Sequence, residues 1–413
     1  MKLFRKLLTL DEAKDAINRL ELKPLGVEET PLLTAHNRVL SEDVTSKLDI
    51  PPFNRSVVDG YAVKATDTFG ATEKQPVHLR VCGIVDIGEL PKVSVSQGQA
   101  AEIVTGAPVP EGADGVVMVE DTARMGYELR VFSPVIEGEN VMKKGSDMKK
   151  DETVLKAGQV LLSREIGVLA ALGVASTKVY AVPRVAVLST GGEVTEPGKE
   201  LSQGKIYDIN AYSLSAAVLE SGGKSVYSGV APDEPKEMHE TLQRTLECAD
   251  AMITSGGVSV GPKDITPQTV DSLGKPGLIF SGIALKPGKP TTMALIGRKP
   301  VFALPGHPTS ALLVFQLLVR PVIERLAGRT PTEVSKVKGF AGMRMFSAKG
   351  RRTFVMVKLR SDKERGLVAE LVETGASGAI TTLAKADGYV EIPENQQFVD
   401  KDEAVEVSLF KKG

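Results

Sequence analysis

One stretch of the chain combines bare backbone, hydroxyl groups and an acid within a short space. Residues 254–266 read TSGGVSVGPKDIT, and Asp264 is the acid near its end. Glycines allow backbone N–H groups to approach an anion closely, and a helix that follows adds positive potential. This composition favours a phosphate-bearing ligand that is held by backbone groups, with a carboxylate nearby.

Other loops that carry glycine, proline and charge occur in the same half of the chain. GGEVTEPG follows the strand-like run RVAVLST, LPGHPTS follows KPVFA, and ALKPGKP precedes TTMALIG. In open α/β sheets, ligands bind where the carboxyl ends of the strands meet. We therefore expect these loops to meet at one edge of a sheet, where Lys286 and Lys289 would neutralise a phosphate or an oxyanion.

Carboxylates also follow predicted strands, at Glu193, Asp233 and Asp264. Separated carboxylates beside phosphates are typical of Mg²⁺ sites, because Mg²⁺ takes oxygen ligands from both protein and substrate. Each acid alone has an ordinary structural interpretation, with Asp233 and Asp264 as helix caps and Glu193 as a solvated loop acid. The coincidence of several charged loops at one predicted edge favours the functional interpretation. The chain has no Walker pattern, and TSGGVSVG does not match G-x-G-x-x-G, which argues against an ATPase and a dehydrogenase.

Length and composition describe an ordinary globular chain. It has 413 residues, 42% of them hydrophobic, and a formal net charge of −1, so we expect about two to four domains and no general affinity for nucleic acid. The two cysteines, Cys82 and Cys248, exclude a disulfide framework. The first residues run into a charged helix without a small-residue cleavage site, and no apolar run is long enough to span a membrane. We therefore expect a soluble, cytoplasmic protein.

Apolar periodicity divides the chain into regions of different secondary structure. Residues 9–20 fit a helix that starts with a capping box of Thr9 and Glu12. Short alternating runs up to about residue 160 predict mainly strands, whereas strands alternate with helices from about residue 179, which predicts a mostly parallel sheet with helices on both faces. One of these helices would have Asn210 as its N-cap, and PTSALLVFQLLVRPVIERLAG would form a long buried helix. Residues 331–413 return to a small β module.

The run PPFNRSVVDGYAV, residues 51–63, is too particular for a simple turn, although Asp59 before Gly60 would suit one. Together with IVTGAPVPEGADGVVM, LSTGGEV, GKIYDINAYSL, TSGGVSVGPKDIT, LKPGKP and LPGHPTSAL, it resembles the molybdopterin molybdenumtransferase family, which includes MoeA and the gephyrin E domain. The motifs occur in the family's order and extend over nearly the whole chain. The resemblance is loosest in the C-terminal module.

The resemblance implies an elongated homodimer of four-domain subunits. The implied fold class is α/β plus β, with a mostly parallel α/β sandwich domain of the molybdopterin-binding type, a mainly β domain, a linking α/β segment and a small C-terminal β-barrel-like domain. The mainly β domain would span residues 54–139, the α/β domain 179–329 and the C-terminal domain 330–413. The linking domain would be discontinuous, with residues 1–53 and 140–178.

The implied reaction takes adenylylated molybdopterin and molybdate and yields molybdenum cofactor and AMP, with a divalent cation such as Mg²⁺. The active site would lie in a cleft where the α/β domain of one subunit faces the β domain of its partner. A molybdopterin adenylyltransferase is a further possible partner, since it makes the adenylylated substrate.

The resemblance also assigns roles to individual positions of this chain. The catalytic residues would be Asp59, Thr105, Glu193, Asp233, Asp264, Pro305 and Pro308. Of these, Glu193, Asp233 and Asp264 would bind the cation, and Asp59 would act across the dimer. The substrate-binding residues would be Asp208, Ser255, Gly256, Gly257, Ser259, Lys286, Lys289, Gly306, Ser310 and Arg351. Within this group, molybdate would be held by Lys286, Lys289, Ser310 and Arg351.

Among the positions that depart from the family's usual residues, three stand next to the predicted site. Gly192 stands where an acid is common, Gly282 where a basic residue is frequent, and His307 where asparagine is usual. These departures leave open the choice between molybdate and tungstate and the identity of the cation. Two other functions also remain open: a molybdopterin adenylyltransferase, which the α/β domain resembles, and a non-catalytic molybdopterin carrier or scaffold. The β segments with Asp59 and Thr105 argue against the first, and the retained acids argue against the second.

Overall fold

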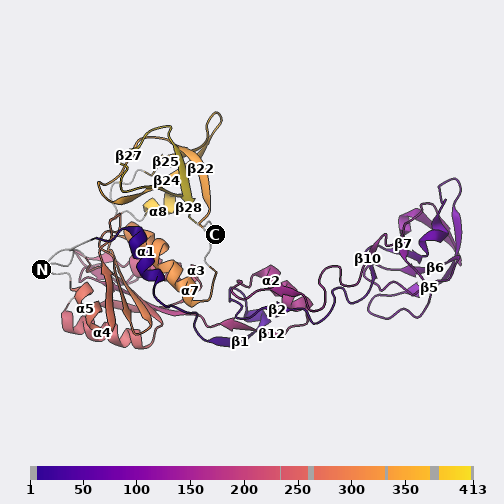
Figure 1. Cartoon of the computed structure of the whole chain (residues 1–413), viewed down its shortest axis with the longest axis horizontal. Coiled ribbons are helices and arrows are strands. Elements are labelled where there is room, and N and C mark those ends of the chain that lie inside the picture. The colour runs from indigo at the N-terminus through magenta and orange to yellow at the C-terminus, as the bar shows by residue number, and fades with distance from the viewer. Residues whose placement is uncertain (1–6, 233, 259–264, 331–333, 373–380, 411–413) are drawn as a thin grey trace.

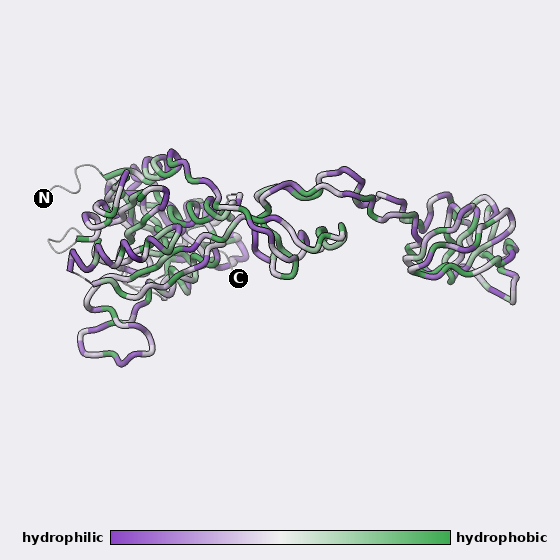
Figure 2. The backbone as a smooth tube through the Cα atoms, turned by 90° about the horizontal axis from the view of Figure 1, so that it is seen from below, coloured by the Kyte–Doolittle hydropathy of each residue, from purple (hydrophilic) through white to green (hydrophobic). Residues whose placement is uncertain are grey.

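The computed structural model describes residues 7–232, 234–258, 265–330, 334–372 and 381–410. Three predicted site residues, Asp233, Ser259 and Asp264, lie outside this part of the chain. The molecule is elongated, with an α/β domain and a C-terminal barrel at one end and a mainly β domain at the other (Figure 1). Narrow segments of chain separate the two ends in the perpendicular view (Figure 2). The fold class predicted from the sequence is confirmed, and the residue limits of the domains stay a prediction.

The chain begins with helix α1 (Leu10–Asn18). The hydroxyl of Thr9 accepts a hydrogen bond from the N–H of Glu12, and the carboxylate of Glu12 accepts one from the N–H of Thr9. This reciprocal capping box is the one that the sequence predicts. The apolar side chains of Leu10, Ala13 and Ile17 are buried against the α/β domain.

A linking module carries the chain outward to the mainly β domain and back again. Each outgoing strand pairs antiparallel with a returning one: β1 with β12, β2 with β11 and β3 with β10. Helix α2 (Ser163–Ala171) packs beside them, and Gly173, just after its C-cap Leu172, has φ of +72°. The strands are β1 (Val27–Pro31), β2 (Val44–Thr45), β3 (Arg55–Ser56), β10 (Val141–Met142), β11 (Thr153–Leu155) and β12 (Ser176–Tyr180).

The mainly β domain has a sheet in the order β7-β4-β6-β5-β9-β8. Successive side chains of β4 go to opposite faces, so that Tyr61 and Val63 join one core and Ala62 joins another. The strands are β4 (Gly60–Val63), β5 (Val77–Val85), β6 (Gln99–Ile103), β7 (Gly115–Met118), β8 (Thr122–Met125) and β9 (Glu128–Val131).

The α/β domain contains a sheet in the order β16-β13-β17-β21-β20-β18. Its first four strands are parallel, and β20 runs antiparallel to both of its neighbours. Along β13, Val185 and Val187 pack toward α1, α3, α6 and α7, whereas Ala186 and Leu188 pack toward α4. Helices thus cover both faces of a mostly parallel sheet (Figure 1). The strands are β13 (Arg184–Thr190), β16 (Lys224–Ala231), β17 (Ala251–Ser255), β18 (Pro276–Ser281), β20 (Thr292–Ile296) and β21 (Lys299–Leu304); the helices are α3 (Asn210–Glu220), α4 (Pro235–Glu247), α5 (Thr266–Ser272), α6 (Pro308–Val314) and α7 (Arg320–Leu326).

The long helix predicted from PTSALLVFQLLVRPVIERLAG is not uniform. A π-helical turn, Phe315–Val319, separates α6 from α7. Pro321 lies at the start of α7, and its ring has no N–H and crowds the carbonyl group four residues earlier. The wider π turn accommodates this proline without ending the helical segment.

The C-terminal module is a closed barrel, because each of its five strands pairs with two others. It lies on the side of the α/β domain that carries α1, α3 and α7 (Figure 1). A short strand of the α/β domain, β19 (Leu285–Lys286), pairs in parallel with β24 of the barrel. The barrel strands are β22 (Lys336–Ala341), β24 (Arg352–Asp362), β25 (Gly366–Leu371), β26 (Gly388–Ile392) and β28 (Ala404–Leu409); the remaining elements there are β23 (Met345–Phe346), β27 (Phe398–Val399) and α8 (Thr381–Lys385).

Candidate functional site

The sheet register brings four loops to one edge of the α/β domain. Ser255 at the end of β17 lies opposite Ser189 of β13 on one side and Leu304 of β21 on the other. The antiparallel strand β20 begins at this edge with Thr292, which pairs with Ser281 at the end of β18. The loops after β13, β17 and β21, and the loop of residues 282–291 between β18 and β20, therefore leave the sheet together. We call this the loop edge.

Two glycines of the loop after β17 have backbone conformations that other residues adopt only with strain. Gly256 has φ of +101° and Gly257 has φ of +60°. A Cβ atom on Gly256 would lie 2.5 Å from the carbonyl oxygen of Thr190, and one on Gly257 would lie 2.5 Å from the hydroxyl oxygen of Thr266. Glycine is therefore required for this loop to pass so close to the end of β13.

The loop after β21 contacts the same region. The hydroxyl of Ser255 donates to the carbonyl oxygen of Pro305 at 3.1 Å, and the N–H of Gly256 donates to the carbonyl oxygen of Leu304 at 3.2 Å. Pro308 begins α6 and is buried, as is Ser310 in the first turn of that helix. The structure thus brings Ser255, Gly256, Pro305 and their neighbours Gly257 and Gly306 together.

Asp208 lies beneath the loop edge and is 3% exposed. Its Oδ1 accepts hydrogen bonds from the Ser189 hydroxyl at 2.7 Å and from the N–H of Ala211, in the first turn of α3, at 3.0 Å. Asp208 therefore holds the start of α3, a role that the sequence assigned to Asn210. That prediction for Asn210 is wrong: it is the first residue of the helix, and its side chain is buried. A substrate contact for Asp208 stays a prediction.

A tyrosine near Asp208 escaped the sequence analysis. Burial and the nearby carboxylate of Asp208 raise the pKa of Tyr227 to about 12. Its ring lies 5.6 Å from the ring of Tyr212, measured between centroids. The hydroxyl of Tyr227, like that of an ordinary tyrosine, is protonated near neutral pH and can donate a hydrogen bond.

Glu193 is exposed and lies just after β13. Its carboxylate folds back over Gly191, because a Cβ atom on Gly191 would lie 2.7 Å from Glu193 Oε2. At Gly192, where the family commonly has an acid, the carbonyl oxygen accepts a hydrogen bond from the ammonium group of Lys205. Because this bond uses the backbone carbonyl, it does not depend on the residue type at position 192.

The loop of residues 282–291 places its lysines between the α/β domain and the barrel. Lys286 is exposed and pairs with Thr353 of β24, two residues after Arg351. Lys289 follows in the same loop and is half-buried. Gly282 has φ of +88°, a conformation that favours glycine over the basic residue frequent in the family. The structure therefore brings Lys286 and Arg351 near each other, although they are far apart in sequence.

Asp59 and Thr105 form a pair in the mainly β domain. The backbone N–H and the hydroxyl of Thr105 both donate to Asp59 Oδ1, at 2.6 and 2.8 Å. These two hydrogen bonds lower the pKa of Asp59, because they stabilise its charged form. The pair lies beside β4 and β6, at the opposite end of the molecule from the loop edge (Figure 1). One chain does not bring Asp59 and Thr105 to Glu193 and Ser255.

The part of the chain that the structure describes contains no group of three His, Cys, Asp or Glu side chains arranged to hold a metal ion. Two of the three predicted Mg²⁺ ligands, Asp233 and Asp264, lie outside that part. Mg²⁺ therefore stays a prediction. Within the same described ranges, no helix has the length and hydrophobicity to cross a membrane.

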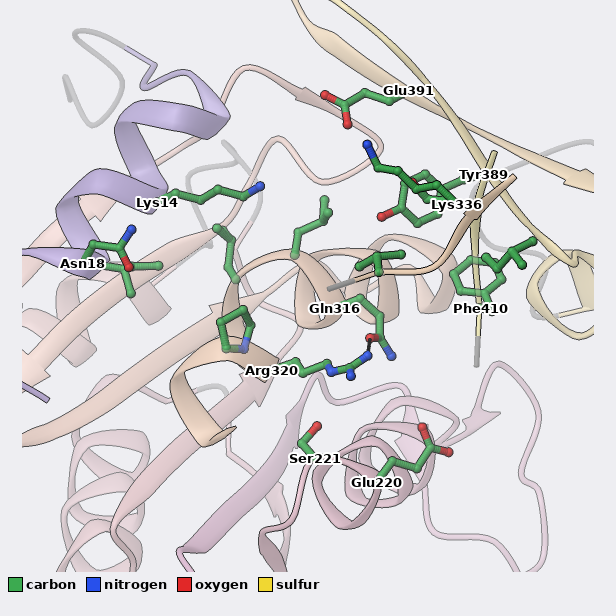
Figure 3. A pocket seen from close by; sticks show the side chains of 17 residues that line it. Lys14, Asn18, Glu220, Ser221, Gln316, Arg320, Lys336, Tyr389, Glu391 and Phe410 are labelled. Atoms are coloured by element: carbon green, nitrogen blue, oxygen red, sulfur yellow. Dashed lines mark hydrogen bonds between the residues drawn. The ribbon is translucent and has the colours of Figure 1, made fainter. Parts of the chain in front are cut away.

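A cavity of about 490 Å³ lies away from the loop edge, between α1, α7 and the barrel (Figure 3). Side chains that line it include Lys14, Arg320, Lys336 and Tyr389. None of the described residues around it belongs to the predicted site. The cavity shows that the barrel and the α/β domain are not tightly packed along their whole junction.

The fold defines a multidomain α/β protein whose loop edge is lined by glycines and adjoins a loop that carries lysines. The chain matches the MoeA N-terminal region (domain I and II) over residues 8–173, a probable molybdopterin binding domain over residues 186–325, and the MoeA C-terminal region (domain IV) over residues 338–410.

Whole-length relatives agree with these matches. A putative molybdopterin biosynthesis protein of Methanocaldococcus jannaschii is 33% identical and covers 100% of both chains. The molybdopterin molybdenumtransferase of Haemophilus influenzae is 32% identical over 98% of this chain and 99% of its own. A crystal structure of the molybdopterin biosynthesis MoeA protein from Pyrococcus horikoshii is 41% identical, with a TM-score of 0.83 over 99% of this chain and 100% of that chain. The chain belongs to the MoeA, or molybdopterin molybdenumtransferase, family, and the resemblance inferred from its motifs is confirmed.

Proposed function

We propose that this protein is a molybdopterin molybdenumtransferase that inserts molybdate into adenylylated molybdopterin and releases AMP. Relatives from Haemophilus influenzae and Bacillus subtilis, which match 98% and 91% of this chain, carry that enzyme's name. The observation that carries the proposal is the loop edge, where glycine-lined backbone and a lysine-bearing loop leave the sheet together. A ligand with phosphates at one end and an oxyanion at the other suits this arrangement.

Different loops bind different parts of the ligand. The backbone of Ser255, Gly256 and Gly257 binds the phosphate end of molybdopterin, because two positive φ values turn the chain sharply there. Lys286, Lys289 and Arg351 bind molybdate, since they provide positive charge on one loop and on the adjoining end of β24. Ser310, which the resemblance assigns to molybdate binding, is buried in the first turn of α6.

The bond that breaks joins the molybdopterin phosphate to AMP. Water attacks the phosphoanhydride, AMP departs and molybdopterin keeps its own phosphate. Asp59 is ionised at neutral pH, as an ordinary aspartate is, and the two hydrogen bonds from Thr105 stabilise its charged form; it accepts a hydrogen bond from the attacking water. Mg²⁺, when bound, would supply positive charge at the phosphates. Of its predicted ligands, only Glu193 is among the described residues, and a carboxylate there would help to hold the ion beside the phosphates.

The proposal requires a homodimer. Asp59 and the loop edge are at opposite ends of one subunit (Figure 1), so a second copy must bring its β domain to the loop edge of the first. Exposed apolar side chains near Asp59, among them Val57 and Val119, provide surface for such a contact. Substrate delivery by a molybdopterin adenylyltransferase belongs to the same proposal, as does a cytoplasmic location.

The decisive experiment measures AMP release from adenylylated molybdopterin and Mg²⁺, with molybdate, tungstate or neither. We expect oxyanion-dependent release, and the preferred oxyanion identifies the metal. A carrier would bind the substrate without turnover, and an adenylyltransferase would instead consume ATP and release pyrophosphate.

Two variants test the shared site. Asp59→Asn and Glu193→Gln should each abolish AMP release when expressed alone, because each substitution then damages both active sites of the dimer. Co-expression should restore about a quarter of the wild-type rate, since mixed dimers keep one intact site. Absence of any rescue, with mixed dimers demonstrated, would place the whole site within one subunit.

A further inference from the structure

Asn210 connects two of the loops that form the loop edge. It is the first residue of α3 and is 8% exposed. Its Nδ2 donates to the hydroxyl oxygen of Ser255, in the loop after β17, at 2.8 Å. The same nitrogen donates to the carbonyl oxygen of Gly306, in the loop after β21, at 2.7 Å. A side-chain amide has two N–H donors, and both are engaged here.

The chemistry of the partners fixes the orientation of the amide. A carbonyl oxygen only accepts, so the atom that faces Gly306 must be the nitrogen of Asn210. The hydroxyl of Ser255 gives its own proton to the carbonyl oxygen of Pro305 and must therefore accept from its other neighbour. A donor at position 210 is the only group that satisfies both oxygens at once.

The position of the Asn210 side chain leaves one of its polar atoms unsatisfied, which packing alone does not explain. In the described part of the chain, Asn210 Oδ1 is buried without a hydrogen-bond partner. A buried polar atom in this state destabilises the folded protein. A polar residue kept in such a place is often one that function requires.

We infer that Asn210 is a positioning residue that locks the Ser255–Gly257 loop to the Pro305–Gly306 loop, and this inference rests on the proposed function. The two loops also approach closely through glycine, since a Cβ atom on Gly306 would lie 3.6 Å from Gly256 Cα. A phosphate held on one loop therefore keeps a fixed distance from groups on the other. Small displacements of reacting groups cost up to about a hundredfold in rate.

The test uses Asn210→Asp, which changes one atom and leaves the volume almost unchanged. The variant places a carboxylate oxygen where a donor faced the Gly306 carbonyl, so two acceptors oppose each other and the loops separate. The matched control is Ser221→Ala, just beyond the other end of α3. Ser221 is 1% exposed and donates only within its own helical segment, to the carbonyl oxygen of Ala217.

In the AMP-release assay with the whole protein, Asn210→Asp should lower kcat by about 10- to 100-fold and change the KM for adenylylated molybdopterin by less than about threefold. Ser221→Ala should change kcat by less than about twofold. The Asn210→Ala and Ser255→Ala effects on kcat should be strongly non-additive, because Asn210 acts through Ser255. A wild-type kcat for Asn210→Asp, or equal losses of kcat in the control, would overturn the inference.

Amide hydrogen exchange supplies a readout that does not need turnover. The N–H of Gly256 is protected by the Leu304 carbonyl, so residues 252–258 and 302–308 should exchange faster in Asn210→Asp than in the wild type and in Ser221→Ala. Unchanged exchange there would contradict the coupling of the loops. Should the wild type release no AMP, the proposed function fails, and hydrogen exchange still decides whether Asn210 couples the loops.

Discussion

Two neighbouring arginines near the start of β24 should affect different properties when they are replaced, one stability and the other molybdate binding. Arg352 is 16% exposed and donates to both carboxylate oxygens of Asp11 in α1, at 3.0 and 2.7 Å. It also lies 3.0 Å from Glu394 and 3.2 Å from Glu391, both in the C-terminal module. Arg352 therefore joins the barrel to α1. Arg351, by contrast, makes no ion pair with the described residues and lies two residues before Thr353, the register partner of Lys286.

The size of the Arg352 effect follows from these contacts. Its partners are partly exposed, so each ion pair contributes about 0.2–1 kcal/mol, and the bidentate pair with Asp11 lies at the upper end of that range. Removal of the guanidinium also leaves three carboxylates without their shared cation. We expect a loss of about 2 kcal/mol in the free energy of unfolding. For a domain of the barrel's size this lowers the midpoint of thermal unfolding by about 8–16 °C.

Calorimetry and AMP release separate the two arginines. Arg352→Ala should lower the unfolding temperature of the barrel by that amount. Arg351→Ala should leave it within about 1 °C and raise the KM for molybdate about tenfold, which corresponds to about 1.4 kcal/mol of lost binding. An unchanged unfolding temperature for Arg352→Ala, or equal destabilisation by both substitutions, would refute the reasoning.

Two further predictions concern pH and a glycine. Arg352 holds the pKa of Asp11 below its ordinary value of 3.8. A carboxylate whose pKa is lower in the folded than in the unfolded protein stabilises the fold at pH values above its unfolded-state pKa. This stabilisation is lost as the pH falls through the folded-state pKa. The difference in unfolding temperature between wild type and Arg352→Ala should therefore be constant near pH 5–7 and shrink below about pH 4. Gly256→Ala should destabilise the protein by more than the roughly 1–3 kcal/mol that backbone strain costs, because its Cβ would meet Thr190. Gly198 has φ of +91° and open space around it. In chemical denaturation, Gly198→Ala should therefore lower the free energy of unfolding only by the cost of backbone strain.

Much of the fold was predictable because local patterns agree with the tertiary structure. The capping box of Thr9 and Glu12 depends on neighbours in sequence, and the helix begins where it predicts. The apolar run of β13 is buried on both faces, as expected for a central parallel strand. The order of the strands was not predictable, nor was the π turn before Pro321, because both depend on packing between distant segments.

In the candidate site too, features set by neighbours in sequence were predictable, and features set by contacts between distant segments were not. Glycine-rich loops after strands indicated the loop edge, since bare backbone at a strand end is visible in the sequence. Asn210 was misread because asparagine after a loop is typical of a helix cap. Its contacts with Ser255 and Gly306 depend on the register of β17 against β21. No pattern in the sequence contains that register.

The separation of Asp59 from the loop edge follows from the construction of the linking module. A single flexible segment could allow the β domain to fold back onto its own α/β domain. Here the outgoing and returning chains are paired at β1–β12, β2–β11 and β3–β10, so bending would break backbone hydrogen bonds in both directions. The paired module therefore acts as a spacer that holds the β domain away. A catalytic role for Asp59 is compatible with this spacer only when a second subunit supplies the loop edge.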